Sequence, residues 1–342
     1  MPLLRVLFVS SCLLMVASPC RAADPLKHLL AGELKWKSTG PLVGPVDRPE
    51  DSCISIKDPT VVRHDGKWHL FCTIRSEKRT HQIEYLNFDD WRNANQAKRQ
   101  ILTMTPGYFC APQVFYFTPE KTWYMIYQVA HPQGKETILP GYSTTKTIDD
   151  PLSWTEPKFL FADKPEHVKS WIDFWVICDD TRAHLFFTSN DGRMWRCDTL
   201  IGQFPYGWNA PEVVLTGDIF EASHTYRIKG TSQFLTIIEA IGERGRRYYK
   251  AYVASRLDGE WKPIADTREK PFASPKNIGG DSAWTTSISH GELLRIGVDE
   301  YLEIDPARME FLYQGVSDAD REKRPYGKIL WELGLLTLEK QP

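Results

Sequence analysis

Three acidic residues, Asp58, Asp173 and Glu221, each lie just before a segment that reads as a buried β-strand. Three carboxylates in one aromatic pocket are what hydrolysis of a glycosidic bond needs, because one must be a protonated acid, one an ionised base, and a third can set the proton affinity of the acid. Glu221 stands between Phe220 and Ala222, and apolar neighbours disfavour the charged form of a carboxyl. We therefore interpret Glu221 as the general acid.

Asp58 follows Lys57, whose positive charge favours an ionised carboxylate, so Asp58 suits the general base. Asp173 is then the third member and modulates the pKa of the acid. A structural alternative exists for each residue, because Asp-Pro, here residues 58–59, is a frequent turn opener. The shared position of the three residues, ahead of three similar segments, is what favours catalysis.

The segments behind these residues follow one pattern of apolar strand, polar turn and aromatic-rich second strand. The pattern occurs at residues 60–74, 113–129, 175–189, 224–241 and 291–304. A spacing of roughly 50 to 65 residues matches one multi-stranded blade per repeat. The sequence therefore predicts an all-β fold, a five-bladed β-propeller, with residues 24–342 forming a single catalytic domain. A large sandwich or a pair of β-domains is the alternative, but no linker rich in Pro, Gly or Ser divides the chain.

A propeller brings the start of each innermost strand to one end of its central axis. We expect five polar side chains to meet there in an axial pocket: Asp58, Gln113, Asp173, Glu221 and His290.

Composition narrows the class of ligand. The 342 residues are 42% hydrophobic and 25% charged, and the net charge is −2. With no excess of Lys and Arg, there is no electrostatic reason to expect nucleic acid or a membrane surface as partner. Twelve Trp and fourteen Tyr suit an uncharged sugar, since flat aromatic faces bind sugar rings, although most of these rings belong in the core. We expect a polysaccharide-binding monomer.

The first 23 residues read as a secretory signal peptide, with Arg5, an apolar run through Val16, and small residues at Ala22 and Ala23. The mature protein is therefore expected to be secreted, either to the medium or to the periplasm. Five cysteines remain after its removal, and we expect free buried thiols with at most one or two disulfides.

Several stretches distributed almost from end to end of the chain are distinctive: WKSTGPLVGP (36–45), SIKDPTVV (55–62), APQVFYF (111–117), WIDFWVICD (171–179), IFEAS (219–223), IIEAIGERGRRYY (237–249) and ISHGELLR (288–295). In these stretches the chain resembles glycoside hydrolase family 62, the α-L-arabinofuranosidases. The resemblance implies a five-bladed propeller that removes arabinofuranosyl side groups from arabinoxylan with inversion. It makes Asp58 the general base, Glu221 the general acid and Asp173 the pKa modulator. Inversion requires roughly 6.5 to 9.5 Å between base and acid to admit a water.

The resemblance also implies a metal, usually Ca²⁺, with His290 in its surroundings. A hydrogen-bonded channel histidine is the alternative, because calcium prefers oxygen ligands. Candidate sugar-binding residues, chosen for hydroxyl donation, amide hydrogen bonding or ring contact, are Lys57, Gln113, Trp175, Arg247 and Tyr313.

Two stretches depart from the family pattern. Ser287 stands where the family commonly has Asp, and Phe109 with Cys110 replaces the usual Arg-Ala. These changes make a carbohydrate-binding propeller without turnover conceivable. A second alternative keeps the fold and changes the sugar: a related propeller glycosidase of the arabinanase or β-xylosidase type.

Overall fold

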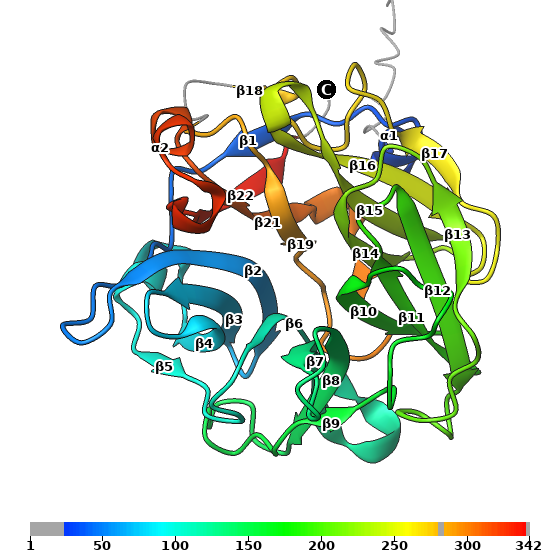
Figure 1. Cartoon of the computed structure of the whole chain (residues 1–342). Helices are drawn as coiled ribbons and strands as arrows, with labels where there is room; N and C mark the ends of the chain where they lie inside the picture. Colours follow the sequence, from blue (N-terminus) through cyan, green and yellow to red (C-terminus); the bar gives the residue numbers. More distant parts are fainter. Residues whose placement is uncertain (1–23, 280–283, 340–342) are drawn as a thin grey trace, which may run out of the picture.

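The computed structural model describes residues 24–279 and 284–339, and these residues form five β-sheets arranged around one axis. The predicted five-bladed propeller is confirmed. Figure 1 shows the sheets around the centre of the ring, with β2, β6, β10, β14 and β19 nearest the middle. The predicted signal peptide lies outside the described residues.

Each of the first three blades is an antiparallel sheet whose strands follow in chain order from the axis outwards. Their strands are β2 (Cys53–His64), β3 (Lys67–Ser76), β4 (Thr80–Phe88) and β5 (Arg99–Ile101); β6 (Phe109–Phe117), β7 (Thr122–Ala130), β8 (Ile138–Thr145) and β9 (Lys158–Phe159); and β10 (Ile172–Cys178), β11 (Arg182–Thr188), β12 (Arg193–Leu200) and β13 (Glu212–Thr216).

The last two blades each recruit strands from elsewhere in the chain. Blade four contains β14 (Glu221–Ile228), β15 (Phe234–Ile241), β16 (Arg247–Ala254), β17 (Lys262–Ala265) and β20 (Glu303–Ile304), and blade five contains β19 (Ser289–Leu293), β21 (Glu310–Gly315), β22 (Glu332–Leu338), β1 (Trp36–Ser38) and β18 (Ile278–Gly279). Because β1 pairs with β22, the two ends of the described chain close the ring within one sheet.

The helices are short and lie between strands. They are α1 (Pro25–Leu30), α2 (Asp318–Lys323) and the 3₁₀ turns η1 (Trp91–Gln96), η2 (Thr118–Glu120), η3 (Glu243–Gly245), η4 (Pro306–Arg308) and η5 (Tyr326–Lys328). No helix of the described residues is both long and apolar enough to cross a bilayer.

The fifth sequence unit, residues 291–304, is not the hairpin that its pattern predicted. β19 pairs with β21, whereas β20 pairs in parallel with β14 of blade four. The intervening segment passes the far ends of other blades, since Val298 accepts a hydrogen bond from Tyr116 N and Glu300 accepts one from Cys178 N. The residues of this alternating segment contact other blades rather than β19. The second strand of blade five therefore begins only at Glu310.

Large aromatic residues fill the space between blades, and their polar atoms bond to neighbouring blades. Trp36 Nε1, for example, donates to the carbonyl of Phe272 at 2.6 Å. The cysteines of the described residues are all free: Cys53, Cys72, Cys110, Cys178 and Cys197. The expected free thiols are therefore present, buried except at the partly exposed Cys53, without disulfides among them. Closure of the ring by β1 and the packing between blades give the axial end of the propeller a fixed geometry.

Candidate active site

Every innermost strand has a break in register near its start. The residues left unpaired at the beginning of the break are Asp58, Ala111, Asp173, Ala222 and His290. The first four have positive φ angles of 45°, 50°, 56° and 52°. Such bulges redirect side chains and are common beside active sites, and each left-handed residue costs of order 1 kcal/mol. In two blades, the following unpaired position holds a proline, Pro59 or Pro112, which has no N–H to offer the ladder.

The bulges show which residues are equivalent. Asp58, Asp173 and His290 share one blade position, whereas Glu221 is the last paired residue before its break. Gln113 is the first paired residue after its break. The prediction that all five polar residues occupy one equivalent position is therefore correct for three of them.

A ring of hydrogen bonds between neighbouring blades holds the bulges. Each unpaired N–H donates to a side chain of the preceding blade: Asp58 to Gln314 Oε1 (2.8 Å), Ala111 to Thr73 Oγ1 (2.8 Å), Asp173 to Gln128 Oε1 (2.8 Å), Ala222 to Asp173 Oδ2 (3.0 Å) and His290 to Glu239 Oε2 (2.7 Å). Four of these acceptors lie on second strands, each opposite the residue that precedes the break. In blade three, the second-strand residue opposite the residue before the break is Thr188. The N–H of Ala222 in the next blade donates to the side chain of Asp173 instead.

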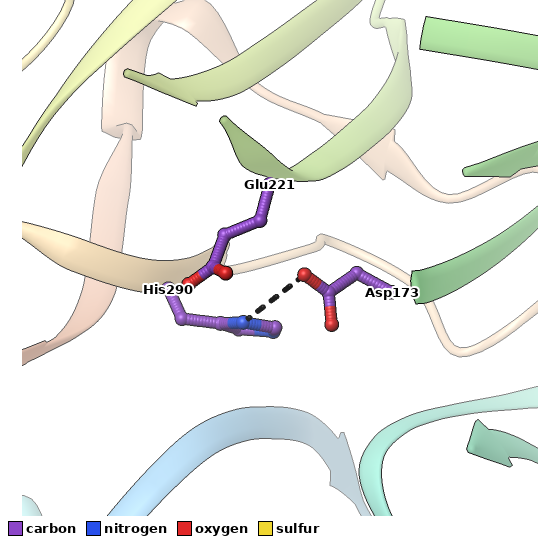
Figure 2. Close-up of side chains that lie close together, drawn as sticks. All are labelled: Asp173, Glu221 and His290. Atoms are coloured by element: carbon purple, nitrogen blue, oxygen red, sulfur yellow. Dashed lines mark ion pairs between the residues drawn. The ribbon is translucent and has the colours of Figure 1, made fainter. Parts of the chain in front are cut away.

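His290 lies between two of the predicted catalytic carboxylates. Its Nδ1 is 3.4 Å from Asp58 Oδ1 and 3.8 Å from Asp173 Oδ2, and all three side chains are at most 8% exposed. Figure 2 shows Asp173 and His290 facing each other, with Glu221 reaching toward them from the start of β14. The structure therefore brings Asp58, Asp173, Glu221 and His290 together at one end of the axis.

The charge of Asp58 is supported from two sides. Burial on its own raises the pKa of Asp58, but the charges of Lys57 and His290, with a hydrogen bond from Thr73, outweigh it and lower the pKa below its ordinary value. Lys57 Nζ lies 3.9 Å from Asp58 Oδ1. Burial lowers the pKa of Lys57, yet Asp58 and other nearby acidic groups give a net rise, so both partners stay charged.

Glu221 has the opposite environment. Burial raises its pKa well above the ordinary value, the charges of Glu239 and Asp173 raise it further, and Arg247 and Lys57 oppose them. The pKa of Asp173 is also raised, chiefly by burial, against the charge of His290. One carboxyl of the cluster is thus held ionised while another favours its proton.

Glu239 is a fourth carboxylate of the site that sequence reasoning missed. It is fully buried, pairs with Glu221 across the β14–β15 ladder, and accepts a hydrogen bond from Ser289 Oγ at 3.0 Å. Arg247 Nη1 lies 3.5 Å from Glu239 Oε1, and its guanidinium lies 3.8 Å from the Phe220 ring centroid. The sequence signal was a single charge inside the apolar run FLTIIEAI. Gln128 and Gln314, likewise on second strands, were missed as well.

Of the predicted sugar-binding residues, Lys57 and Arg247 lie beside the carboxylates and three lie in packed interior. Gln113 is fully buried, and both polar atoms of its amide bond to the backbone of Val176 at 2.7 Å. Trp175 is 1% exposed and stacks on His224, with ring centroids 4.1 Å apart. The structure gives these two side chains roles in contacts between blades.

Tyr313 is the third of these residues. It is fully buried, and its hydroxyl bonds to Ser38 Oγ at 2.9 Å. Its residue type suited ring contact with a sugar, but the same ring serves as core packing in blade five.

The residues that depart from the family pattern have distinct surroundings. Ser287 is fully buried, and its Oγ accepts a hydrogen bond from Arg247 N at 3.4 Å. Phe109 packs in the core against Tyr127. Cys110 is the last paired residue before the break in its blade, as Lys57 and Glu221 are in theirs. These departures therefore leave the four clustered side chains in place.

The donor set does not fit a calcium ion. Asp173, Glu221 and His290 each offer one ligand atom within 4.8 Å of the others. Calcium takes six to eight oxygen ligands, whereas this set supplies one imidazole nitrogen and two carboxylates. Asp173 Oδ2 is already engaged with Ala222 N. We therefore assign His290 to the carboxylate cluster and no chemical step to a metal.

Comparison with known proteins gives a family match. The model of a family described as "Glycosyl hydrolase family 62" matches residues 35–337. A curated relative, alpha-L-arabinofuranosidase C of Cellvibrio japonicus, is 36% identical over 320 residues, which cover 91% of this chain and 48% of that protein. The chain thus spans about half the length of this relative.

Solved structures agree with this match over nearly their full length. The catalytic domain of a Coprinopsis cinerea GH62 alpha-L-arabinofuranosidase is 36% identical, with a TM-score of 0.83 over 89% of this chain and 97% of that one. A GH62 hydrolase in complex with xylotriose is also 36% identical, with a TM-score of 0.84 over 92% of this chain and 100% of that one.

Proposed function

The chain belongs to glycosyl hydrolase family 62, and from this premise we propose that it removes non-reducing-end α-L-arabinofuranosyl side groups from arabinoxylan or a related hemicellulose, with inversion. Two of the relatives named above are α-L-arabinofuranosidases, and the third, a GH62 hydrolase, is a complex with xylotriose, a xylose trisaccharide. Xylose units form the main chain of arabinoxylan, which motivates the choice of polymer.

The observation that carries this proposal is the opposite electrostatic environment of two carboxyls at one end of the axis. Asp58 has a lowered pKa beside Lys57, and Glu221 has a strongly raised pKa beside Glu239. Pairs of carboxyls whose pKa values are pushed apart supply the base and the acid of glycoside hydrolysis. Asp58 is therefore the base and Glu221 the acid.

In the proposed reaction, Asp58 takes a proton from a water molecule whose oxygen attacks the anomeric carbon of the arabinosyl group. The bond from that carbon to the xylose oxygen breaks, and Glu221 gives its proton to the departing oxygen. The negative charge of Asp173 helps Glu221 keep its proton until that moment. Attack from the face opposite the departing sugar inverts the anomeric centre, so the first product is β-arabinose.

Two cations beside the carboxylates are proposed to bind the arabinosyl hydroxyls. Lys57 and Arg247 are both largely buried, with 13% and 12% of their side chains exposed, and buried cations donate strong hydrogen bonds. The pKa of Tyr326 of η5 is raised, chiefly by burial of its hydroxyl, with the charge of Lys57 lowering it and that of Glu221 raising it, while the residue as a whole is 56% exposed. An exposed ring at this rim suits contact with a xylose unit of the main chain.

The remaining expectations are part of the same proposal. The basic and apolar order of residues 1–23 supports export of the protein by a signal peptide. A monomer is proposed as the working form because one chain supplies the base, the acid and both cations. One domain carries the activity, since the five blades close into a single ring through β1.

The direct test is to incubate the protein with arabinoxylan and follow the released sugar by proton NMR. Wild-type enzyme is expected to release β-arabinose first, whereas Asp58→Asn and Glu221→Gln are expected to lose about a hundredfold to ten-thousandfold in kcat, the usual contribution of a general acid or base. Asp65→Asn is the matched control, because Asp65 lies in the β2–β3 turn and its side chain is 88% exposed.

Other outcomes identify the alternatives. Early α-arabinose would refute inversion, and full activity in both variants would refute the assigned roles. Release of xylose or of arabinan fragments in a substrate panel would instead indicate the β-xylosidase or arabinanase type. Binding of arabinoxylan oligosaccharides by calorimetry, with no product after long incubation, would indicate a binding protein without turnover.

A further inference from the structure

A cavity of about 200 Å³ adjoins the acid side of the site. It lies between the β15–β16 turn and the segment that follows β17, and Arg247 belongs both to its wall and to the surroundings of Glu221. Four of its ten lining residues are cationic, Arg246, Arg247, Arg268 and Lys276, and Glu243 is the one carboxylate among the described residues that line it. We call it the basic cavity.

The cations of the basic cavity are only partly neutralised. Arg246 pairs with Asp318 at 2.9 Å, and Lys276 lies 3.9 Å from Glu269, where both side chains are mostly exposed. Within the described part of the chain, Arg268 forms no ion pair, and its Nη2 donates only to the carbonyl of Ile241 at 3.3 Å.

Arg247 joins this wall to the carboxylate cluster and keeps an unused donor beside Glu239. Its Nη1 is buried and has no hydrogen-bond partner among the described residues, although Glu239 lies 3.5 Å away. A buried donor without an acceptor costs free energy that a bound acceptor can recover. The wall therefore has both positive charge and hydrogen-bonding capacity to offer a ligand.

A fifth cation, Arg321 of α2, lies close to the basic cavity. Burial lowers the pKa of Arg321, the nearby charges of Arg247 and Arg246 lower it further, and Asp318 and Glu322 of α2 oppose them. Arg321 donates to the carbonyls of Arg244 and Gly245 in the β15–β16 turn. Its donors are thus directed at the turn that forms one side of the cavity.

We propose that the basic cavity binds the carboxylate of a hexuronic acid substituent carried by the same polysaccharide, next to the arabinosylated unit. This inference rests on the proposed function, because it concerns a second substituent of that substrate. Arg247 is already assigned to the arabinosyl group, and a neutral xylose chain gains little from the charge of the other three cations, whereas a carboxylate accepts paired hydrogen bonds from a guanidinium. The basic cavity is local, so it suits one anionic group better than a polyanion, which needs an extended basic surface.

The test compares two oligosaccharides that share one arabinosylated xylose backbone, of which one also carries a glucuronosyl group on a neighbouring xylose. Wild-type enzyme is expected to show a kcat/KM on the order of tenfold higher for the glucuronosylated compound, the value of one charge-assisted hydrogen bond at a partly solvated site. The preference should shrink between about 20 mM and about 500 mM NaCl, because salt screens exposed charges.

Arg268→Gln is the test variant, and Arg246→Gln is a second one in case the first folds poorly. Both should bring the ratio of the two kcat/KM values close to one. The matched control is Arg256→Gln, because Arg256 is 73% exposed at the opposite end of β16 and should keep the wild-type ratio. An equal kcat/KM for both compounds in wild-type enzyme, or an unchanged ratio in both test variants, would overturn the proposal.

Two further arms separate the remaining explanations. Inorganic phosphate and free glucuronate are added as competitors, and binding of phosphate without any preference for the glucuronosylated compound would make the cavity a free-anion site and refute the proposal. If neither oligosaccharide releases arabinose, the proposed function fails. The cavity is then tested independently by calorimetry, in which only the glucuronosylated compound should bind more weakly to Arg268→Gln than to wild-type protein.

Discussion

Replacing Glu239 with glutamine should move the alkaline limit of activity to lower pH. Glu239 belongs to the set of side chains that hold the five bulges, and two blades use glutamine, Gln128 and Gln314, for the same hydrogen bond. An amide is therefore sufficient to accept from His290 N. The carboxylate of Glu239 adds a charge that this structural duty does not require.

The size of the change in the pKa of Glu221 can be judged from the pairing of β14 with β15. Glu239 and Glu221 are directly opposite each other on β15 and β14. Two carboxylates about 6 Å apart interact by about 3 kcal/mol at an effective dielectric constant of about 20, which corresponds to about two pKa units. Arg247, 3.5 Å from Glu239, cancels part of this field. We therefore expect the pKa of Glu221 to fall by less than this uncompensated interaction alone would give.

The direction of the change in pKa is set by all the charges that act on Glu221. Glu239 and Asp173 raise its pKa, while Arg247 and Lys57 lower it. Removing the charge of Glu239 deletes a raising contribution and also leaves Arg247 less neutralised, so both changes lower the pKa. Because the acid must be protonated to act, the alkaline limb of the pH profile moves to lower pH, and the acid limb, set by Asp58, stays in place.

The measurement is kcat/KM on an arabinosylated xylooligosaccharide across the pH range, for wild-type enzyme and Glu239→Gln. Glu303→Gln is the matched control, since Glu303 lies on β20 of the same blade, where that strand pairs with the far end of β14. An alkaline limb that stays in place in a folded Glu239→Gln protein would show that Glu239 is already uncharged in the wild type. That result would refute the electrostatic role given to it here.

Three other predictions follow from the same contacts. Glu221→Gln should raise the free energy of unfolding at about pH 7, by at most about 1.4 kcal/mol for each pH unit between the ordinary pKa of Glu and pH 7, because folding raises the pKa of Glu221. The gain should vanish at about pH 3, where the folded and unfolded states both hold the proton; urea unfolding at the two pH values measures it. Gln314→Leu should reduce kcat roughly tenfold or more with little change in KM, because Asp58 N then lacks its acceptor, and steady-state kinetics would contradict this by showing a wild-type kcat. Dialysis against a chelator should leave kcat unchanged, because the donor set around His290 does not suit calcium; a loss that added Ca²⁺ restores would disprove this.

The fold was predictable where strand pairing is local. In the first four blades, the innermost strand and its partner form a hairpin, so one stretch of sequence contains both. In blade five the partner of β19 is β21, beyond an excursion that adds β20 to blade four. Periodicity within the segment 291–304 carries no information about such distant pairing, which is why that hairpin prediction was wrong.

The candidate site was predictable in part for a related reason. Asp58 and Asp173 stand at bulges, so their polarity interrupts apolar strands and is visible in the sequence. Gln128 and Gln314 act across blades on backbone atoms far away in the chain, and nothing near them in sequence indicates those partners. Gln113, Trp175 and Tyr313 illustrate the reverse problem, because their residue types suit a sugar and a packed interior equally well.

The ring of bulges also explains how a fivefold scaffold produces a site without fivefold symmetry. A bulge occurs near the start of the innermost strand in each blade, but the side chain of its first unpaired residue differs. It is a carboxylate at Asp58 and Asp173, an imidazole at His290, and a methyl group at Ala111 and Ala222. In blade four the acid stands one residue earlier, so its position depends on Ala222, whose N–H is held by Asp173 Oδ2.

That single hydrogen bond of 3.0 Å connects the pKa modulator to the backbone of the general acid. Asp173 therefore influences Glu221 in two ways, through its charge and through the position of the strand that carries the acid. Asp173→Asn removes the charge but keeps an oxygen that can accept from Ala222 N, whereas Asp173→Ala removes both. The difference in kcat between these two variants isolates the positioning effect, and the shift of the alkaline limb in Asp173→Asn isolates the charge. If the two variants had equal kcat values, the hydrogen bond to Ala222 would have no part in positioning the acid.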